Sequence, residues 1–96
     1  MIKVNLIKTN DIVTGLKVTG HAKSAEYGND LICAAVSAIL TGGFNAFNDN
    51  DINECSLKEG YASVNVISQR GLIILETIIV QLKTIEVQYP KNIKIK

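Results

Sequence analysis

The fold is decided by residues 20–37, G-H-A-K-S-A-E-Y-G-N-D-L-I-C-A-A-V-S, where a strand-like pattern is followed by a helical one. The stretch contains His21, the only histidine of the chain, and Cys33, one of its two cysteines. Asp30 is a residue type that caps helices, so we expect a helix to begin there and Cys33 to lie in its first turn. A thiol in that position faces unpaired backbone N–H groups and the positive end of the helix dipole, and both favour the thiolate.

Patterning outside this stretch indicates the other elements. Alternation of apolar and polar residues predicts strands, and apolar residues three and four apart predict helices. The expected strands cover residues 2–8, 12–19, 54–58, 61–68 and 92–96, and the expected helices cover 30–47 and 71–88. Gly15 is a possible bulge, Glu59-Gly60 is a hairpin turn, and Pro90 ends the second helix. The order β-β-α-β-β-α-β predicts an α+β sandwich, with a mostly antiparallel sheet and two packed helices.

Each expected helix has a face that should pack on the sheet. In the first helix this face is Leu31, Ala34, Ala35, Ala38, Ile39 and Gly42, and the neighbouring stripe is Cys33, Ser37 and Leu40 or Thr41. The small residues should let this helix approach the sheet closely. The second helix carries one apolar stripe of Leu72, Leu75, Ile79 and Leu82 and another of Ile74, Ile78 and Ile85. One stripe can serve the core, so the excess predicts a homodimer.

Length and composition limit the classes of function. A chain of 96 residues with 47% hydrophobic and 20% charged residues makes one domain, residues 1–96. Its net charge of +1 is too weak to indicate nucleic-acid binding by electrostatics alone, so no direct nucleic-acid partner is expected. Lysines gather near both ends of the chain, and we interpret them as solvated strand edges, with a local basic face as the alternative.

The compartment follows from the termini and the cysteines. The N-terminal residues lack the apolar run of a secretory signal, and residues 72–82 are too short and too polar to span a bilayer. We therefore expect a cytoplasmic protein without a membrane contact, in which Cys33 and Cys55 stay reduced. Two cysteines and one histidine without paired spacing supply too few ligands for zinc, so neither a metal nor a cofactor is expected.

A cysteine with a base beside it can attack a carbonyl, and His21 is the one histidine that can serve Cys33. Asp30 is either a helix cap or a group that orients His21. Ser37 lies one turn beyond Cys33, where it contacts the thiol or a substrate carbonyl, or bonds back to the helix backbone. The alternative for the pair is a small buried cysteine and a surface histidine without a joint role.

The loop between these residues is expected to cover the substrate. We predict that Gly20, Tyr27 and Gly28 contribute to substrate binding, although Tyr27 can equally anchor the loop. Cys55 has no base nearby in the sequence and is expected to be a packed strand residue.

The segment G-H-A…Y-G-x-D-L-I-C-A-A-V-S resembles the ribosomal-processing cysteine protease family, called Prp or YsxB-like. The resemblance extends over essentially the whole chain, including L-E-T-I-I-V-Q-L-K-T-I-E in the second helix. It implies a small cytosolic endopeptidase that removes the N-terminal extension of a large-subunit ribosomal protein, with His21 as base and Cys33 as nucleophile. It further implies a dimer, a flexible loop at the active site, and a groove for adjacent aromatic residues, with Phe44, Phe47 and Tyr27 as possible walls.

Two other functions are compatible with the sequence. A ribosome-assembly adaptor would grip a ribosomal protein tail without cutting it. A redox-sensing thiol protein would use an accessible Cys33, with Cys55 as the resolving cysteine.

Overall fold

The computed structural model describes residues 1–20 and 29–96, and of Asn29 and Asp30 it describes the backbone. The elements are the strands β1 (Ile2–Thr9), β2 (Ile12–Thr19), β3 (Ile52–Lys58), β4 (Tyr61–Val66) and β5 (Ile93–Ile95), the helices α1 (Asn29–Asn45) and α2 (Gln69–Gln88), and the 3-10 turn η1 (Asp49–Asp51). The predicted order of strands and helices is confirmed, with boundaries that agree within two residues.

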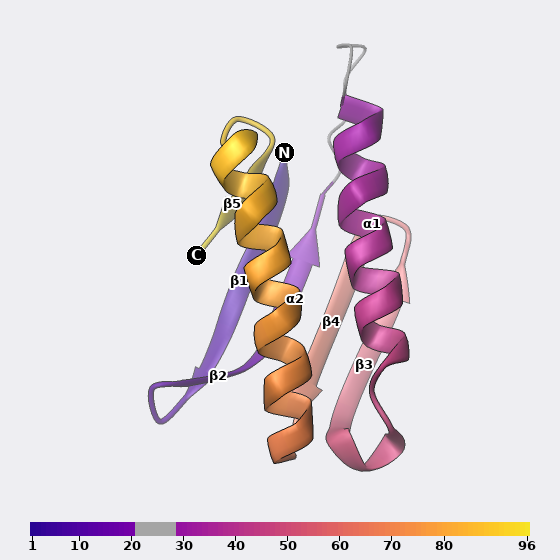
Figure 1. Ribbon diagram of the computed structural model, residues 1–96, viewed down its shortest axis with the longest axis vertical. Coiled ribbons are helices and arrows are strands. Elements are labelled where there is room, and N and C mark those ends of the chain that lie inside the picture. The colour runs from indigo at the N-terminus through magenta and orange to yellow at the C-terminus, as the bar shows by residue number, and fades with distance from the viewer. Residues whose placement is uncertain (21–28) are drawn as a thin grey trace.

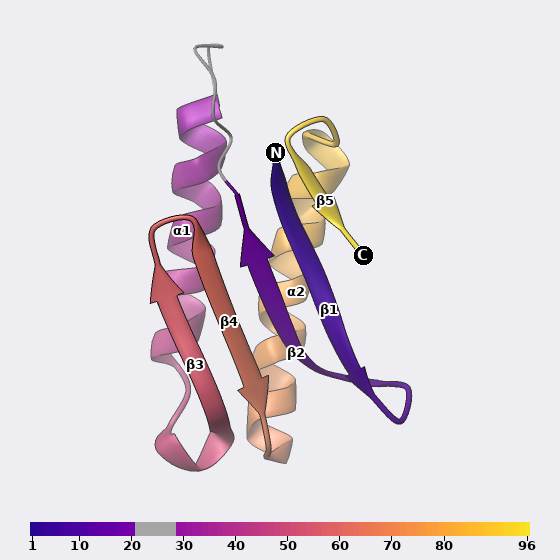
Figure 2. The ribbon, with the colours of Figure 1, turned by 180° about the vertical axis from the view of Figure 1, so that it is seen from behind.

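The strands form one sheet in the order β3-β4-β2-β1-β5. All neighbours are antiparallel except β5, which lies parallel to β1. Both helices cover the same face of this sheet (Figure 1), and the view from behind shows the other face without a helix in the described part of the chain (Figure 2). The predicted α+β architecture is therefore a sheet with one covered face and one open face.

The hairpins form where the turn chemistry indicates. Asn10 and Asp11 join β1 to β2 with φ of 52° and 68°, the left-handed values that a two-residue hairpin loop requires. Gly60 joins β3 to β4 with φ of 74°. The register between β1 and β2 shifts next to Gly15, so the predicted bulge is confirmed.

The core lies between the covered face of the sheet and the two helices. Buried residues of the strands include Ile2, Val4, Leu16, Val18, Ala62, Val64 and Ile93. The first helix contributes Ile32, Val36, Leu40 and Phe44, which are four residues apart. The predicted sheet-facing stripe was wrong, because Leu31 is 71% exposed. The stripe of larger side chains buries more apolar area than the alanine-rich stripe, and this sets the rotation of α1.

Both predicted stripes of α2 serve the core. Leu75, Ile78, Ile79 and Leu82 are buried, and Leu72, Ile74 and Ile85 pack against them as half-buried residues. The second stripe therefore does not provide the excess apolar surface from which the sequence predicted a homodimer. A different row, Ile73, Val80 and Val87, is exposed on α2. Among the described helices, neither has the length and apolar character needed to cross a membrane.

The two helices approach each other closely at Gly43. A Cβ on Gly43 would lie 2.5 Å from Cγ1 of Ile78, a residue that is 1% exposed. A Cβ on the preceding Gly42 would meet no atom within 4 Å. The close approach that the small residues permit is thus to α2, and not to the sheet as the sequence suggested.

The two glycines provide a matched pair of substitutions. Gly42→Ala should stabilise the protein by up to about 1 kcal/mol, because alanine favours the helix and finds open space. Gly43→Ala should lower the stability, because the added methyl group overpacks Ile78 at a cost of about 1–3 kcal/mol. Urea unfolding of both variants measures the difference, and equal effects would contradict this packing.

Asp51 joins the turn η1 to the start of α2. Its carboxylate accepts hydrogen bonds from the backbone N–H of Asn48 at 2.8 Å and from Oγ of Ser68 at 2.7 Å, and it pairs with Arg70. Ser68 in turn caps α2 by accepting a hydrogen bond from the N–H of Gly71 at 2.8 Å. The Asn48 N–H, then Ser68 and Arg70, hold the pKa of Asp51 below its usual value, although desolvation opposes them.

This carboxylate should make stability depend on pH. The pKa of Asp51 is lower in the folded protein than in the unfolded chain. The ionised carboxylate therefore stabilises the fold fully above the ordinary carboxyl pKa of about 4, and this stabilisation is lost as the pH falls through the lower pKa of the folded state. Asp51→Asn should therefore lower Tm at pH 7, and the gap to the unsubstituted protein should narrow at about pH 2–3. Thermal melts at both pH values test this, with Asp49→Asn on the exposed side of η1 as the control. A gap that is constant with pH would contradict the role of the charge.

Candidate active site

Cys33 lies on α1 as a half-buried residue that packs against the edge of the core. The helix begins at Asn29, so the expected N-cap, Asp30, is a helical residue, and Cys33 is one full turn into the helix. In α-helical geometry the N–H of Cys33 then pairs with the carbonyl four residues earlier, and among the described residues the N–H groups without an intrahelical acceptor are those of residues 29–31. Cys33 is therefore the fifth helical residue and not the third, so it lies two residues farther into the helix than the sequence predicted.

A cleft of about 270 Å³ opens beside Cys33. It lies between α1, the end of β2 and the turn from β3 to β4. Its lining residues are Ile2, Val18, Gly20, Cys33, Val36, Ser37, Leu40, Thr41 and residues 57–62. The thiol-bearing residue is thus part of a hollow that can receive another chain.

The α1 wall of the cleft has a polar row. Cys33, Ser37 and Thr41 follow at four-residue spacing, so they lie along one side of the helix, next to the apolar Val36 and Leu40. This is the neighbouring stripe that the sequence indicated, and it includes both Leu40 and Thr41. Ser37 is exposed one turn from Cys33, which places its hydroxyl within the same cleft.

Gly20 forms the β2 rim of the cleft. Its N–H donates to the carbonyl of Gly60 at 3.1 Å, and its φ is +92°. A Cβ at this position would lie 2.3 Å from the carbonyl oxygen of Met1, so the close approach of the first strand requires glycine. The structure therefore places Gly20, one of the predicted substrate-binding residues, in the cleft.

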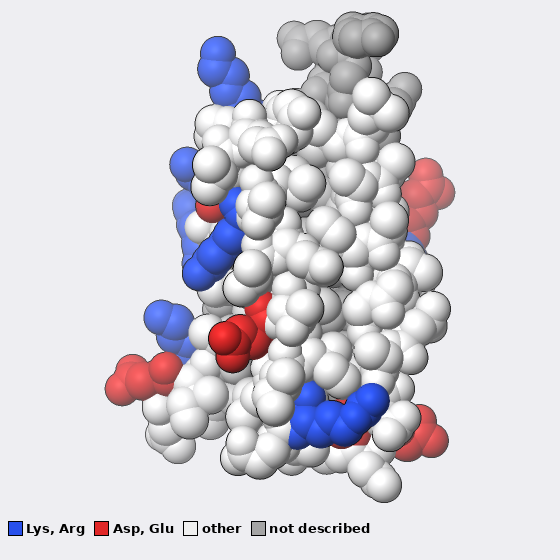
Figure 3. Space-filling model, in the orientation of Figure 1, with Lys and Arg blue, Asp and Glu red and all other residues white. Residues whose placement is uncertain are grey.

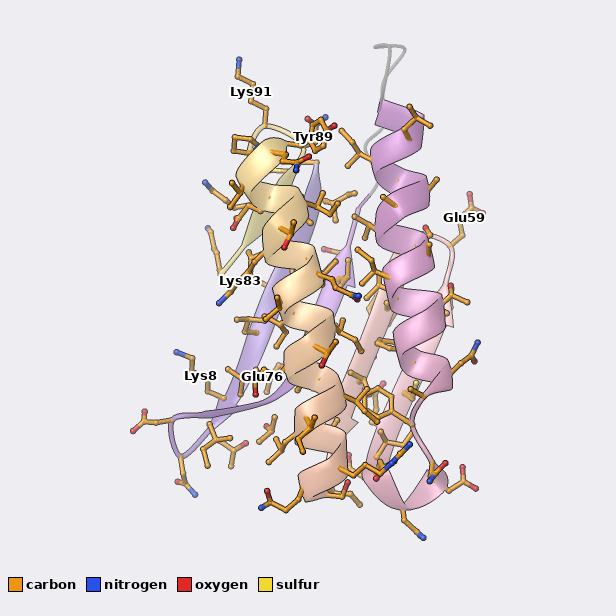
Figure 4. The ribbon with its side chains drawn as sticks, in the orientation of Figure 1. Lys8, Glu59, Glu76, Lys83, Tyr89 and Lys91 are labelled. Carbon is orange, nitrogen blue, oxygen red and sulfur yellow. The ribbon has the colours of Figure 1, made fainter. Side chains whose placement is uncertain are left out.

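The opposite rim consists of the β3–β4 hairpin, which sequence reasoning missed. Leu57 and Tyr61 flank the turn at Glu59-Gly60, and Figure 4 shows Glu59 at the outer edge beside α1. The ammonium groups of Lys17 and Lys58 lie 5.6 and 5.9 Å from the centre of the Tyr61 ring. The hairpin turn was recognisable, but its place beside Gly20 follows from the pairing of β4 with β2, which no local pattern reveals.

Several predicted site residues lie outside what the structure describes. These are His21, Tyr27 and Gly28, together with the side chain of Asp30. The suggested aromatic walls Phe44 and Phe47 are not in the cleft. They pack against each other with ring centres 6.1 Å apart near the other end of α1, where Phe44 joins the core.

The second cysteine has a different environment. Cys55 is exposed on the edge strand β3, so the prediction of a packed residue was wrong. Local desolvation, and secondly the charge of Glu54, raise the pKa of the Cys55 thiol, which disfavours its thiolate. Cys33 and Cys55 are not joined in a disulfide. Within the described residues, no three side chains of His, Cys, Asp or Glu are grouped to hold a metal ion.

Comparison with known proteins gives consistent matches. The family model described as cysteine protease Prp matches residues 1–94. The ribosomal processing cysteine protease Prp of Staphylococcus aureus is 35% identical over 103 aligned positions, which cover 99% of this chain and 97% of that protein. The protein of the same name from Mycoplasma genitalium is 37% identical, covering 99% of this chain and 94% of the relative.

Solved structures extend the match to the fold. The crystal structure of the essential ribosomal processing protease Prp from S. aureus with a substrate peptide superposes with a TM-score of 0.86 at 30% identity, covering 100% of this chain and 98% of that one. A second structure of the S. aureus enzyme, with a covalently linked product peptide, has a TM-score of 0.83 over the same coverage. The present chain therefore belongs to the cysteine protease Prp family and is a cysteine protease.

Proposed function

We propose that this chain is a cytoplasmic endopeptidase that removes the N-terminal extension of a large-subunit ribosomal protein, with Cys33 as nucleophile and His21 as general base. The observation that carries the proposal is the position of Cys33 in the wall of an open cleft. The S. aureus relative has been solved with a substrate peptide and with a covalently linked product peptide, which supports covalent chemistry on an extended chain.

The nucleophile is assigned by comparing the two cysteines. Cys33 lies in the cleft among groups that can bind a peptide, whereas Cys55 lies on the edge strand with a raised pKa beside Glu54. The base is assigned by chain connectivity, because one peptide bond joins His21 to Gly20, and Gly20 forms the rim of the same cleft. No other residue of the chain is a histidine.

The reaction follows the usual course of thiol proteases. The Cys33 thiolate attacks the scissile carbonyl, and His21 gives a proton to the leaving amine, which departs as the new N-terminus. Water activated by His21 then hydrolyses the acyl-enzyme, restores the thiol and releases the extension as a carboxylic acid. Backbone N–H groups at the start of α1 are the nearest set of donors for the oxyanion.

The remaining predicted residues would have supporting roles. Asp30 would orient His21, and Ser37 would donate to the substrate or to the thiol from one turn along α1. Gly20, Tyr27 and Gly28 would bind the substrate backbone, with Gly20 allowing a close approach because it has no side chain.

The two cysteines give a direct test of the nucleophile. Cys33→Ala should reduce cleavage of the extended ribosomal protein at least about 10³-fold, because it removes the attacking sulfur. Cys55→Ser is the matched control and should keep cleavage within about twofold, because Cys55 lies outside the cleft. Intact-mass spectrometry of the substrate detects the two products. Cleavage that persists in Cys33→Ala would overturn the assignment.

Two further readings sharpen this experiment. His21→Ala should also abolish cleavage while the protein keeps its far-UV circular dichroism. Cleavage by the unsubstituted protein separates the enzyme from the ribosome-assembly adaptor, since an adaptor would bind the extended ribosomal protein with either residue at position 33 and would yield no products.

We further propose that two copies associate through the helix layer. Ile73, Val80 and Val87 are 67%, 56% and 80% exposed and are spaced by seven residues, which aligns them along α2. Beside them a groove of about 500 Å³ between the helices is lined mainly by Ala, Gly and Ile residues. Figure 3 shows that charged side chains are sparse over this face. Such a surface favours association with a second copy.

Ile73→Asp combined with Val80→Asp should convert the protein to a monomer, because two carboxylates would be buried in the contact. Sedimentation velocity at tens of micromolar protein measures the change. Ile12→Asp, an exposed apolar residue of the β1–β2 hairpin, should leave the dimer intact. A monomer in the unsubstituted protein would refute the proposal.

A further inference from the structure

The open face of the sheet concentrates lysines that are scattered in the sequence. The register aligns side chains in rows across the strands, and the first row consists of Lys94, Lys3, Thr19, Tyr61 and Lys58. The second row consists of Lys96, Asn5, Lys17, Ser63 and Ser56, with Lys96 placed by its hydrogen bonds to Val4 and Leu6. Four interstrand spacings make each row about 19 Å long.

The charge on this face is almost entirely of one sign. Five of the ten basic residues of the chain lie in these two rows, and all five are exposed. Glu54 is the acidic residue among the described strand positions of this face, and it accepts a hydrogen bond from Ser63 at 2.6 Å. The net charge of +1 for the whole chain therefore conceals a strongly basic surface.

Protection of strand edges does not account for all these lysines. Lys58, Lys94 and Lys96 lie on the edge strands β3 and β5, where lysine hinders unwanted pairing. Lys3 and Lys17, however, lie on the central strands β1 and β2. Lys3, Lys94 and Lys96 also surround a hollow of about 270 Å³ together with Met1 and Asn5. A hollow lined by three lysines suits a phosphate group.

The aromatic ring in the first row adds to this chemistry. Tyr61 holds the ammonium groups of Lys17 and Lys58 within 6 Å of its ring centre, so the two rows converge there. Thr19, Asn5 and Ser56 supply hydroxyl and amide groups between the lysines. Lysines around an aromatic ring, with polar groups between them, are the features by which sheet surfaces bind single-stranded RNA.

We propose that this open face binds a strand of RNA, chiefly through its phosphates. A protein partner fits less well, because lysine is depleted from protein interfaces and their centres are apolar. A membrane surface fits less well too, because Ile7 is the one large apolar strand residue exposed on this face in the described part of the chain. The inference goes beyond the proposed proteolysis and does not depend on it.

Fluorescence anisotropy with a labelled single-stranded RNA of mixed sequence tests the proposal. The unsubstituted protein should bind with a Kd on the order of 10⁻⁵ M at about 50 mM KCl, weakening as salt rises. The triple variant Lys3→Gln, Lys94→Gln, Lys96→Gln should bind at least about tenfold more weakly, with a log–log salt slope reduced by about two. These three lysines lie outside the Cys33 cleft, so peptide cleavage should be unchanged.

The matched control removes the same charge elsewhere. Lys8, Lys83 and Lys91 are exposed and lie along the helix side and its rim (Figure 4). Replacing all three with glutamine should leave RNA binding within about twofold, because none of them lies in the two rows. Equal losses in the two triple variants would overturn the proposal, since total charge alone would then explain binding.

Three other results would also overturn it. These are no binding of RNA at low salt, displacement of the RNA by polyglutamate at equal charge concentration, and tighter binding to phosphatidylserine vesicles than to RNA. Cys33→Ala should bind RNA as the unsubstituted protein does. Binding and cleavage are thus measured separately, so a negative result for one proposal does not decide the other.

Discussion

Burial of one sheet face under α1 and α2 is the constraint on which the other features depend. Alternate residues of the central strands are apolar on that side, so they must be covered, and the two helices cover them with rows of branched side chains. Burial of Ile32 and Val36 fixes the rotation of α1. That rotation turns Cys33 away from the centre of the core and toward the hairpin of β3 and β4, where the cleft opens. The position of Cys33 is thus a consequence of core packing.

Much of the fold could be predicted because local signals and long-range pairing agree. The turn residues Asn10, Asp11 and Gly60 have the left-handed angles that their residue types favour, so the hairpins formed as expected. The face of α1 could not be predicted in the same way. Leu31 and Ile32 are adjacent and equally apolar, and a rotation of one residue decides which of them is buried. Only the sizes of the side chains that follow, through Phe44, settle that choice.

The part of the candidate site that lies on a single helix was predictable from the sequence. Cys33 and Ser37 are one turn apart on a helix, and their presence in one cleft follows from helical spacing. The far wall was not predictable, because Leu57 and Tyr61 reach it through the pairing of β4 with β2. The precise start of α1 was also beyond the sequence, because Asn29 and Asp30 are residue types that favour the N-cap and yet both are helical, which places Cys33 two residues farther from the helix start than predicted.

The two faces of the sheet meet at the β3–β4 turn. Lys58 and Tyr61 belong to the first row of the open face, and both also line the cleft that contains Cys33. A polyanion held along that row would therefore end at the rim of the cleft. A peptide tail that leaves an RNA-bound protein would then reach the thiol without release of the RNA. In this arrangement the open face would raise the local concentration of the RNA-bound protein, while packing on the covered face would keep Cys33 in a fixed position.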